Sequence, residues 1–322
     1  MAEADQDGAA FALAHLSDVH LGPLPAVGLR HWNLKRVLGW LNWQYRRRHV
    51  YSRDVLDRLV DDLRVQAPDH IAVTGDLANL GLPAEHELAL DWLGTLGTPD
   101  RVTVIPGNHD IYSGIGADLG TARWQPYMSA NTAATDHAIA EAMGGEHAFP
   151  FVRRFGKLAI IALNSAVPTL PFYAIGRLGP QQLDQLAKIL DRLGAEGMMR
   201  VVLIHHPPLP GLSKPRHDLE DAAALADVLE RHGAELVLHG HEHSEMLAWH
   251  PTHGGRIPII GVPSASLAMP YKQEPLARYN LYRLLPGKNR PRIEMIARGL
   301  AEPNGPVVEL TRKWIDRQLD GD

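Results

Sequence analysis

The stretch Pro106-Gly107-Asn108-His109-Asp110 indicates, more than any other, how this chain folds and what chemistry it carries. It follows a short apolar run at residues 102–105, which has the pattern of a buried strand. Proline and glycine then end that strand and force a turn. An amide oxygen is a neutral metal ligand and an imidazole can donate a proton. Alone, such a loop is more often a solvated turn, so its meaning depends on the rest of the chain.

Four other predicted strands also end in Asp or His side chains. In chain order, these ends carry Asp18 and His20, then Asp76, then His205 and His206, and finally His241 and His243. In an open α/β sheet, sites assemble at the carboxyl ends of the strands. Each ending has an ordinary explanation as a turn, but five in order are improbable as coincidence. We therefore expect these side chains to form one site.

The composition limits what can hold a metal in that site. The 322 residues include no cysteine and 18 histidines. Thiolate ligands and disulfides are therefore excluded, and any metal must be held by Asp, Asn, Glu and His. A mixed set of carboxylate, amide and imidazole suits Mn, Fe or Zn and does not choose among them. The formal net charge of −5 gives no global basic field, so we expect no nucleic-acid polymer as a partner.

The distribution of apolar residues predicts a cytoplasmic protein of one main domain. Residues 1–9 are acidic and read as a disordered leader without the apolar region of a signal peptide. No apolar run is long enough to span a bilayer. We expect the domain to cover residues 10–300, with an irregular insertion at 114–147. Residues 301–322 form a C-terminal tail, in which 307–319 are predicted to be a short helix.

Residues 30–50 have an unusual composition, in which three Trp, one Tyr and several Leu alternate with Arg and Lys. A helical apolar stripe runs through this segment; its members are Leu34, Val37, Leu38, Leu41 and Tyr45, and Trp32, Trp40 and Trp43 widen it. The first interpretation is a helix whose stripe packs on the core and whose basic residues reach to solvent. The second interpretation is a cap that contacts a membrane surface or a lipid-like substrate, because Trp together with Arg and Lys is typical of segments at the membrane–water interface.

The five blocks together resemble the calcineurin-like metallophosphoesterase superfamily. They are Asp18-Val19-His20, Gly75-Asp76, Gly107-Asn108-His109-Asp110, His205-His206-Pro207-Pro208 and Gly240-His241-Glu242-His243. The bacterial class III cyclic-nucleotide phosphodiesterase branch is the most similar. The resemblance implies an α/β fold, a four-layer αββα sandwich of two mixed β-sheets flanked by helices. The strands expected after residue 245 agree with it.

The resemblance also implies a binuclear metal centre and a role for each residue. One metal would be held by Asp18, His20, Asp76 and His243, and the other by Asp76, Asn108, His205 and His241, so that Asp76 bridges. His205 is preferred to His206 because the family's ligand stands two residues before a proline. His109 would be the catalytic histidine and Asp110 its orienting partner. A hydroxide between the metals would attack phosphorus, which makes the protein a hydrolase of phosphoesters.

Three functions follow from this resemblance. The first is a phosphodiesterase for a small molecule such as a cyclic nucleotide. The second is a lipid- or nucleotide-pyrophosphate-directed hydrolase, similar to those that cleave UDP-diacylglucosamine, at the inner face of the membrane. Residues 30–50 favour it, although one branch of that type carries Arg where His109 stands here. The third is a non-catalytic binding module, which typically lacks ligands that are all present in this sequence. The oligomeric state does not follow from the sequence.

Overall fold

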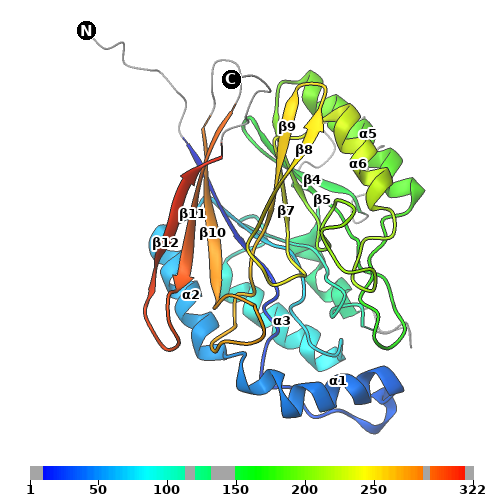
Figure 1. Cartoon of the computed structure of the whole chain (residues 1–322), viewed down its shortest axis with the longest axis vertical. Coiled ribbons are helices and arrows are strands. Elements are labelled where there is room, and N and C mark those ends of the chain that lie inside the picture. The colour runs from blue at the N-terminus through cyan, green and yellow to red at the C-terminus, as the bar shows by residue number, and fades with distance from the viewer. Residues whose placement is uncertain (1–9, 113–119, 132–148, 286–290, 316–322) are drawn as a thin grey trace.

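Two six-stranded mixed sheets pack face to face, with helices on their outer sides (Figure 1). The computed structural model describes residues 10–112, 120–131, 149–285 and 291–315. Most of the core lies between the sheets and under the helices, where the strand residues are almost fully buried. The arrangement confirms the expected four-layer sandwich. The predicted leader and most of the insertion at 114–147 lie outside the described residues.

The first sheet has the strand order β12-β11-β10-β1-β2-β3. Its strands are β1 (Phe11–Leu16), β2 (His70–Val73), β3 (Val102–Val104), β10 (Arg278–Leu285), β11 (Arg292–Leu300) and β12 (Val307–Trp314). The first three run parallel, and the last three form an antiparallel meander beside β1. The carboxyl ends of β1, β2 and β3 therefore lie at one end of the sandwich.

The second sheet has the strand order β4-β5-β6-β7-β9-β8. Its strands are β4 (Phe151–Phe155), β5 (Leu158–Ala162), β6 (Met199–Leu203), β7 (Leu236–His239), β8 (Met246–Thr252) and β9 (Gly255–Gly261). The run β5-β6-β7-β9 is parallel, and β4 and β8 are antiparallel edges. Strands buried on both faces need continuous apolar sequence, which explains why these runs were predictable.

The helices lie mainly where apolar periodicity predicts them. They are α2 (Arg53–Gln66), α3 (Pro83–Leu96), α5 (Pro180–Ala195) and α6 (Ala222–His232), with a 3-10 segment, η3 (Gly120–Met128). In α5 the apolar residues Leu186, Ile189, Leu190 and Leu193 recur at helical spacing and are fully buried. Figure 1 shows α5 and α6 outside the second sheet and α2 outside the first.

The C-terminal tail was predicted to contain a short helix, and that prediction is wrong. Residues 307–314 form β12, which pairs with β11 from Leu300↔Val307 to Glu294↔Trp314. Two valines and a threonine give this segment good strand propensity. The neighbouring edge of β11 supplies the backbone partners that a helix would otherwise make internally. The folded domain therefore continues beyond residue 300.

The segment 30–50 folds as a helix with short 3-10 turns at both ends, η1 (Leu29–His31), α1 (Leu34–Tyr45) and η2 (Arg47–His49). Figure 1 shows α1 at the end of the sandwich where β1 ends. The predicted stripe does not pack on the core: Leu34 is 68% exposed and Tyr45 77% exposed. The helix buries Trp43, one of the tryptophans that widen the stripe, together with Arg36. The packed-stripe interpretation is therefore wrong for Leu34 and Tyr45, whereas the tryptophan side of the helix is the side that is buried.

The hydrogen bonds of Arg36 explain which face of α1 is buried. Its guanidinium donates to the backbone carbonyls of Leu80, Gly81 and His31 at 3.1, 2.7 and 3.0 Å. Carbonyls at the end of a loop need donors, and a buried guanidinium needs acceptors, so each satisfies the other. Fixing Arg36 inward places the residues on the opposite side of the helix in solvent.

One carboxylate joins α2 to the outer face of the first sheet. Asp62 accepts two hydrogen bonds from Arg298 on β11, both 2.7 Å, and a third from the Tyr279 hydroxyl on β10, also 2.7 Å. Partial burial acts to raise the pKa of Asp62, but the bonds from Arg298 and Tyr279 hold it below its ordinary value. Folding therefore favours the ionised form.

We predict that Asp62→Asn lowers the free energy of unfolding at pH 7 by about 1.5–3 kcal/mol, the usual contribution of hydrogen bonds to a charged group. Because the pKa is lowered in the folded state, this contribution is present above the unfolded pKa and is lost as the pH falls through the folded pKa. Urea titrations at pH 7 and below about pH 4 would measure it.

The matched control is Asp61→Asn, because Asp61 is the neighbouring, exposed carboxylate, whose ion pair among the described residues is with Arg64 on its own helix. Exposed pairs contribute about 0–1 kcal/mol, so this change should be small. Equal effects of the two substitutions would contradict the proposed link between α2 and the sheet.

Candidate metal centre

All seven predicted metal ligands come together between the two sheets. Three strands of the first sheet and two of the second end at this point. The ligands are Asp18 and His20 after β1, Asp76 after β2, Asn108 after β3, His205 after β6, and His241 and His243 after β7. Ligand atoms of Asp18, His20 and His243 all lie within 4.8 Å of one another, as do those of Asp18, Asp76 and His205. The cluster divides into a first group of Asp18, His20 and His243 and a second group of Asn108, His205 and His241.

The backbone is strained where these side chains leave their strands. Of the nine non-glycine residues with positive φ in the described ranges, five are predicted ligands. They are Asp18 (52°), His20 (44°), Asp76 (56°), His241 (72°) and His243 (50°). Such left-handed residues each cost about 1–3 kcal/mol and concentrate at functional sites. Here they turn the chain abruptly, so that consecutive strand ends aim inward.

Two glycines of the predicted blocks allow these loops to touch. A Cβ on Gly107 would collide with the carboxylate and backbone of Asp76. A Cβ on Gly240 would collide with the Ser17 hydroxyl and come within 2.6 Å of Asp18 Oδ2. Only glycine permits approaches this close. These positions explain why glycine precedes the polar residues of both blocks.

The first group surrounds the end of β1. His20 Nδ1 donates to the carbonyl of Ala78 at 3.2 Å, which leaves Nε2 facing His243 Nε2 at 3.3 Å. Asp18 Oδ1 is buried, accepts no hydrogen bond, and lies 3.2 Å from His243 Nε2. A buried carboxylate oxygen without a donor is costly unless something positive occupies the space before it.

The second group surrounds the amide of Asn108. Its Oδ1 lies 3.1 Å from His205 Nε2 and 2.9 Å from His241 Nδ1. The other nitrogen of each imidazole donates to a backbone carbonyl, His205 to Thr74 at 2.6 Å and His241 to His217 at 3.0 Å. Anchoring one nitrogen in this way fixes the tautomer and leaves the other as a ligand.

Asp76 lies between the two groups. Its Oδ2 is 4.0 Å from His20 Nε2 and 3.6 Å from His205 Nε2. Burial, and then the charge of Asp18, raise the pKa of Asp76 to about 8. The ionised pair therefore needs compensating positive charge at this point, which two cations shared by Asp76 would supply.

The spacing of the imidazoles fits this interpretation. His20 Nε2 and His243 Nε2 are 3.3 Å apart, as are His205 Nε2 and His241 Nδ1. Ligands about 2.0–2.1 Å from one ion lie about 3–3.4 Å from each other. Lone pairs that face each other at this distance repel unless a proton or a metal lies between them. The donor set of carboxylate, amide and imidazole therefore fits two divalent ions.

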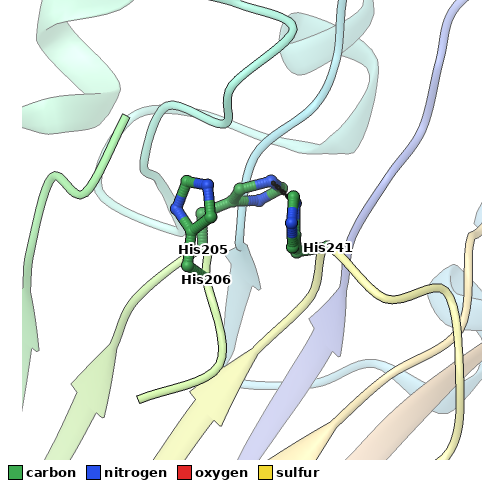
Figure 2. Close-up of side chains that lie close together, drawn as sticks. All are labelled: His205, His206 and His241. Carbon is green, nitrogen blue, oxygen red and sulfur yellow. Dashed lines mark hydrogen bonds between the residues drawn. The ribbon is translucent and has the colours of Figure 1, made fainter. Parts of the chain in front are cut away.

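His206 is not suited to be a ligand, although it is close to the cluster. Figure 2 shows it beside His205 and His241, and its ring centre is 4.4 Å from that of His241. Its Nδ1 lies 2.8 Å from the Ser165 hydroxyl, and its Nε2 lies 3.2 Å from the carbonyl of Ala174. Both nitrogens are therefore engaged, which supports the choice of His205.

His109 presents one nitrogen to the site. Its Nδ1 donates to the carbonyl of Asn79 at 2.6 Å, and its backbone N–H donates to Asp76 Oδ1 at 2.7 Å. The ring stacks on Tyr112 with centres 5.4 Å apart. Burial, and then the charge of Arg47, hold the pKa of His109 well below its ordinary value. The group that can exchange a proton is therefore Nε2.

Asp110 was predicted to orient His109, and the structure corrects this role. Its carboxylate accepts the backbone N–H groups of Asp76 at 2.9 Å, Gly107 at 2.8 Å and Ala78 at 2.8 Å. Asp110 thus ties the loop after β2 to the loop after β3. The orienting acceptor of His109 is the Asn79 carbonyl, which no side-chain pattern could have indicated.

Three further side chains, which no pattern in the sequence indicated, contact this cluster. Glu274 and Tyr51 both reach His243 Nδ1, with oxygens at 3.0 and 3.1 Å. Arg47 lies beside His109, with Nη1 3.5 Å from Nε2. All three come from segments outside the five blocks, so only their tertiary placement reveals them.

The cluster opens into a cavity of about 930 Å³. Arg47, Asn108, His109, His241 and His243 are among the residues that line it. Asn42 of α1 and Ala174 of the loop 166–178 also line it, so both segments reach the cavity. A cavity of this size can hold a small phosphoester beside the cluster.

The amino-acid sequence of the chain that forms this fold and this cluster matches a known protein family. The family model described as calcineurin-like phosphoesterase matches residues 11–245. The chain belongs to this family. Membership identifies the protein as a phosphoric ester hydrolase and confirms the resemblance seen in the five blocks. Glu274 lies beyond the matched region, whereas Arg47 and Tyr51 lie within it.

Two curated relatives are bacterial phosphodiesterases. A protein of Synechococcus sp., named "Probable cyclic nucleotide phosphodiesterase", is 29% identical over 209 residues, which are 64% of this chain and 68% of that relative. A cAMP/cGMP dual specificity phosphodiesterase of Mycobacterium tuberculosis is 27% identical over 241 residues. That match covers 72% of this chain and 62% of the relative, which is less than two thirds of its length.

A solved structure supports the fold. A dimetal phosphatase from Danio rerio superposes with a TM-score of 0.63 and 14% identity, over 97% of this chain and 100% of that one. At this identity the likeness shows the shared fold of a calcineurin-like phosphoesterase and no more.

Glu274 should hold His243 in position for metal binding. A carboxylate that accepts the second imidazole N–H orients the ligand and raises its basicity. We predict that Glu274→Gln weakens metal binding by about 10–100-fold, measured by competition with a coloured chelator. Gln273→Ala, an exposed neighbour in the same loop, is the control. Equal metal affinity of Glu274→Gln and the unaltered protein would rule this role out.

Proposed function

We propose that the protein is a dinuclear metal-dependent phosphodiesterase that acts on a small molecule. The observation that carries the proposal is the position of Asp76 between two groups of converging ligand atoms, 4.0 Å from His20 Nε2 and 3.6 Å from His205 Nε2. A bridging ligand must reach two ions at once, and a carboxylate in this position could do so. The complete ligand set argues against a non-catalytic module.

Two divalent ions in this site would supply a water of lowered pKa and would neutralise charge on the phosphoryl oxygens. The chain itself supplies the remaining functions. Asn108 is a neutral ligand, so it leaves its ion more electrophilic than a carboxylate would. His109 faces the cavity through Nε2, and is the group placed to pass a proton to the leaving oxygen. Because Nδ1 carries the proton of the neutral ring, Nε2 would first have to take this proton from the attacking water. Manganese, iron and zinc all suit these ligands.

The substrate that we propose first is a cyclic nucleotide. The names of the two curated relatives support it. The cavity of about 930 Å³ is large enough for a nucleotide, and the net charge of −5 does not favour a nucleic-acid polymer.

The metal-loaded protein should hydrolyse bis-p-nitrophenyl phosphate in preference to p-nitrophenyl phosphate, and should turn over 3′,5′-cyclic AMP. Asp76→Ala should lose both metals and at least about 100-fold in rate, because one carboxylate serves both ions. Initial rates with added Mn, together with metal content, would measure this.

Asp91→Asn, an exposed carboxylate on α3, is the control and should change neither quantity. Near-normal turnover of Asp76→Ala with both metals retained would sink the proposal. Diester hydrolysis without cyclic AMP turnover would favour the second candidate below. Bound metals without any hydrolysis would favour a non-catalytic module.

The second candidate is a lipid- or nucleotide-pyrophosphate-directed hydrolase at a membrane surface, and the exposed face of α1 favours it. We call this surface the α1 face; its members are Leu29, Leu34, Val37, Leu41 and Tyr45, all exposed. Leu170 and Phe172 of the loop 166–178 are also exposed, and Lys35 joins α1 to that loop through hydrogen bonds to Thr169. Exposed apolar residues gathered like this mark an interaction surface.

The charge of this segment fits an anionic lipid surface. Residues 19–52 contain no Asp or Glu and include six Arg and Lys residues, although the whole chain is acidic. Arg30 and Arg46 flank the α1 face and are exposed. Apolar side chains bordered by basic ones are typical of helices that lie in the membrane interface. In the described residues, no helix is long and apolar enough to cross a bilayer.

We predict that the protein floats with liposomes that contain phosphatidylglycerol and not with neutral ones. Leu34→Ser combined with Tyr45→Ser should abolish flotation, because these side chains would enter the interface. Trp43 is only 5% exposed and is a poor choice for this test. Val65→Ser, an exposed apolar residue of α2, is the control. A protein that stays at the bottom of the gradient with anionic liposomes would refute membrane contact.

A further inference from the structure

Arg47 is the buried member of three consecutive arginines. It begins η2, directly after α1, and its neighbours Arg46 and Arg48 are exposed. Arg47 is only 9% exposed. The chain therefore turns one guanidinium of the three inward, toward the cavity that the metal ligands line.

No carboxylate neutralises this guanidinium at close range. Within the described parts of the chain, Arg47 forms no ion pair with an Asp or Glu oxygen at 4.0 Å or less. Its neighbours are the Tyr51 ring, whose centre is 4.9 Å away, and His109 Nε2 at 3.5 Å. Burial acts against the charged guanidinium, but Tyr51 and the more distant carboxylates of Asp76 and Glu274 raise the pKa of Arg47. The guanidinium therefore stays charged beside the cavity, without a carboxylate in direct contact, and can bind an anion that enters there.

The location decides which anion fits. Arg47 and the metal ligands Asp76, Asn108 and His243 line the same cavity. A guanidinium presents parallel N–H donors that match two oxygens of a phosphoryl group. A phosphoryl group that approaches His109 Nε2 would therefore also come within reach of Arg47.

We propose that Arg47 binds a non-bridging oxygen of the substrate's phosphoryl group, beside His109. This inference rests on the proposed phosphodiesterase function and adds a residue outside the five blocks to the active site. Arg47 stabilises the negative charge that develops on the phosphoryl oxygens in the transition state. The same contact binds the phosphate group of the product. The ligand class is a phosphate or phosphodiester oxyanion.

A purely structural role is the alternative, because Arg47 also contacts Tyr51, and the Tyr51 hydroxyl lies 3.1 Å from His243 Nδ1. In that case Arg47 would act only by keeping Tyr51 and His243 in place. Its removal would then lower metal affinity, whereas the loss of a phosphate contact would leave metal affinity unchanged. The two roles are therefore separable by measurement.

The test uses inorganic phosphate as a probe on the metal-loaded protein, with Arg47→Met, Arg47→Lys and the control Arg48→Met. Calorimetry should show phosphate binding weakened by about 10–100-fold in Arg47→Met, the loss expected for a charge-assisted hydrogen bond. The KM for bis-p-nitrophenyl phosphate should rise and kcat should fall. Arg47→Lys should recover part of the affinity, because it keeps the charge and loses the paired donors. Metal content should stay unchanged.

Arg48→Met removes an exposed arginine from the same turn and should bind phosphate like the unaltered protein. Unchanged phosphate affinity in Arg47→Met, or loss of metal in both Arg47 variants, would overturn the inference. If the unaltered protein hydrolyses no diester while Arg47→Met still loses phosphate affinity, the proposed function fails and the anion site stands.

Discussion

The structure depends on two buried carboxylates, Asp18 and Asp76, at the point where both sheets end. Burying like charges together is unfavourable, and the raised pKa of Asp76 expresses that cost. Positive charge must therefore be supplied at this point. The imidazole nitrogens that face each other at 3.3 Å also require positive charge between them. Carboxylates and imidazoles that converge in this way fit divalent metal ions.

The fold tolerates this cluster of buried charges because other hydrogen bonds hold the loops and the imidazole rings in place. Asp110 ties two loops together through three backbone N–H groups, and carbonyls anchor His20, His205 and His241. Five ligands keep positive φ in a rigid sandwich whose core is almost fully buried. The strain at the strand ends is therefore balanced by packing elsewhere.

The segment between β1 and α2 reaches both the protein surface and the cavity. Its outer side carries the α1 face, and its inner end places Arg47 beside His109. Asn42 of the same segment lines the cavity, next in sequence to the exposed Leu41. The same segment therefore carries exposed apolar residues and two residues that line the cavity.

The amino-acid sequence alone indicated the strand ends, the polar residues that converge at them and the family, because a metal site needs particular side chains directly after particular strands. Apolar runs and glycine positions are local signals, so they could be recognised without the structure. Which face of α1 is buried depends on tertiary contacts, since two of the three carbonyls that bind Arg36 belong to Leu80 and Gly81, far away in sequence. The tertiary structure also decided that residues 307–314 form a strand, that Asp110 ties loops rather than orienting His109, and that Arg47, Tyr51 and Glu274 reach the site. Each of these depends on partners far away in sequence, which no local pattern contains.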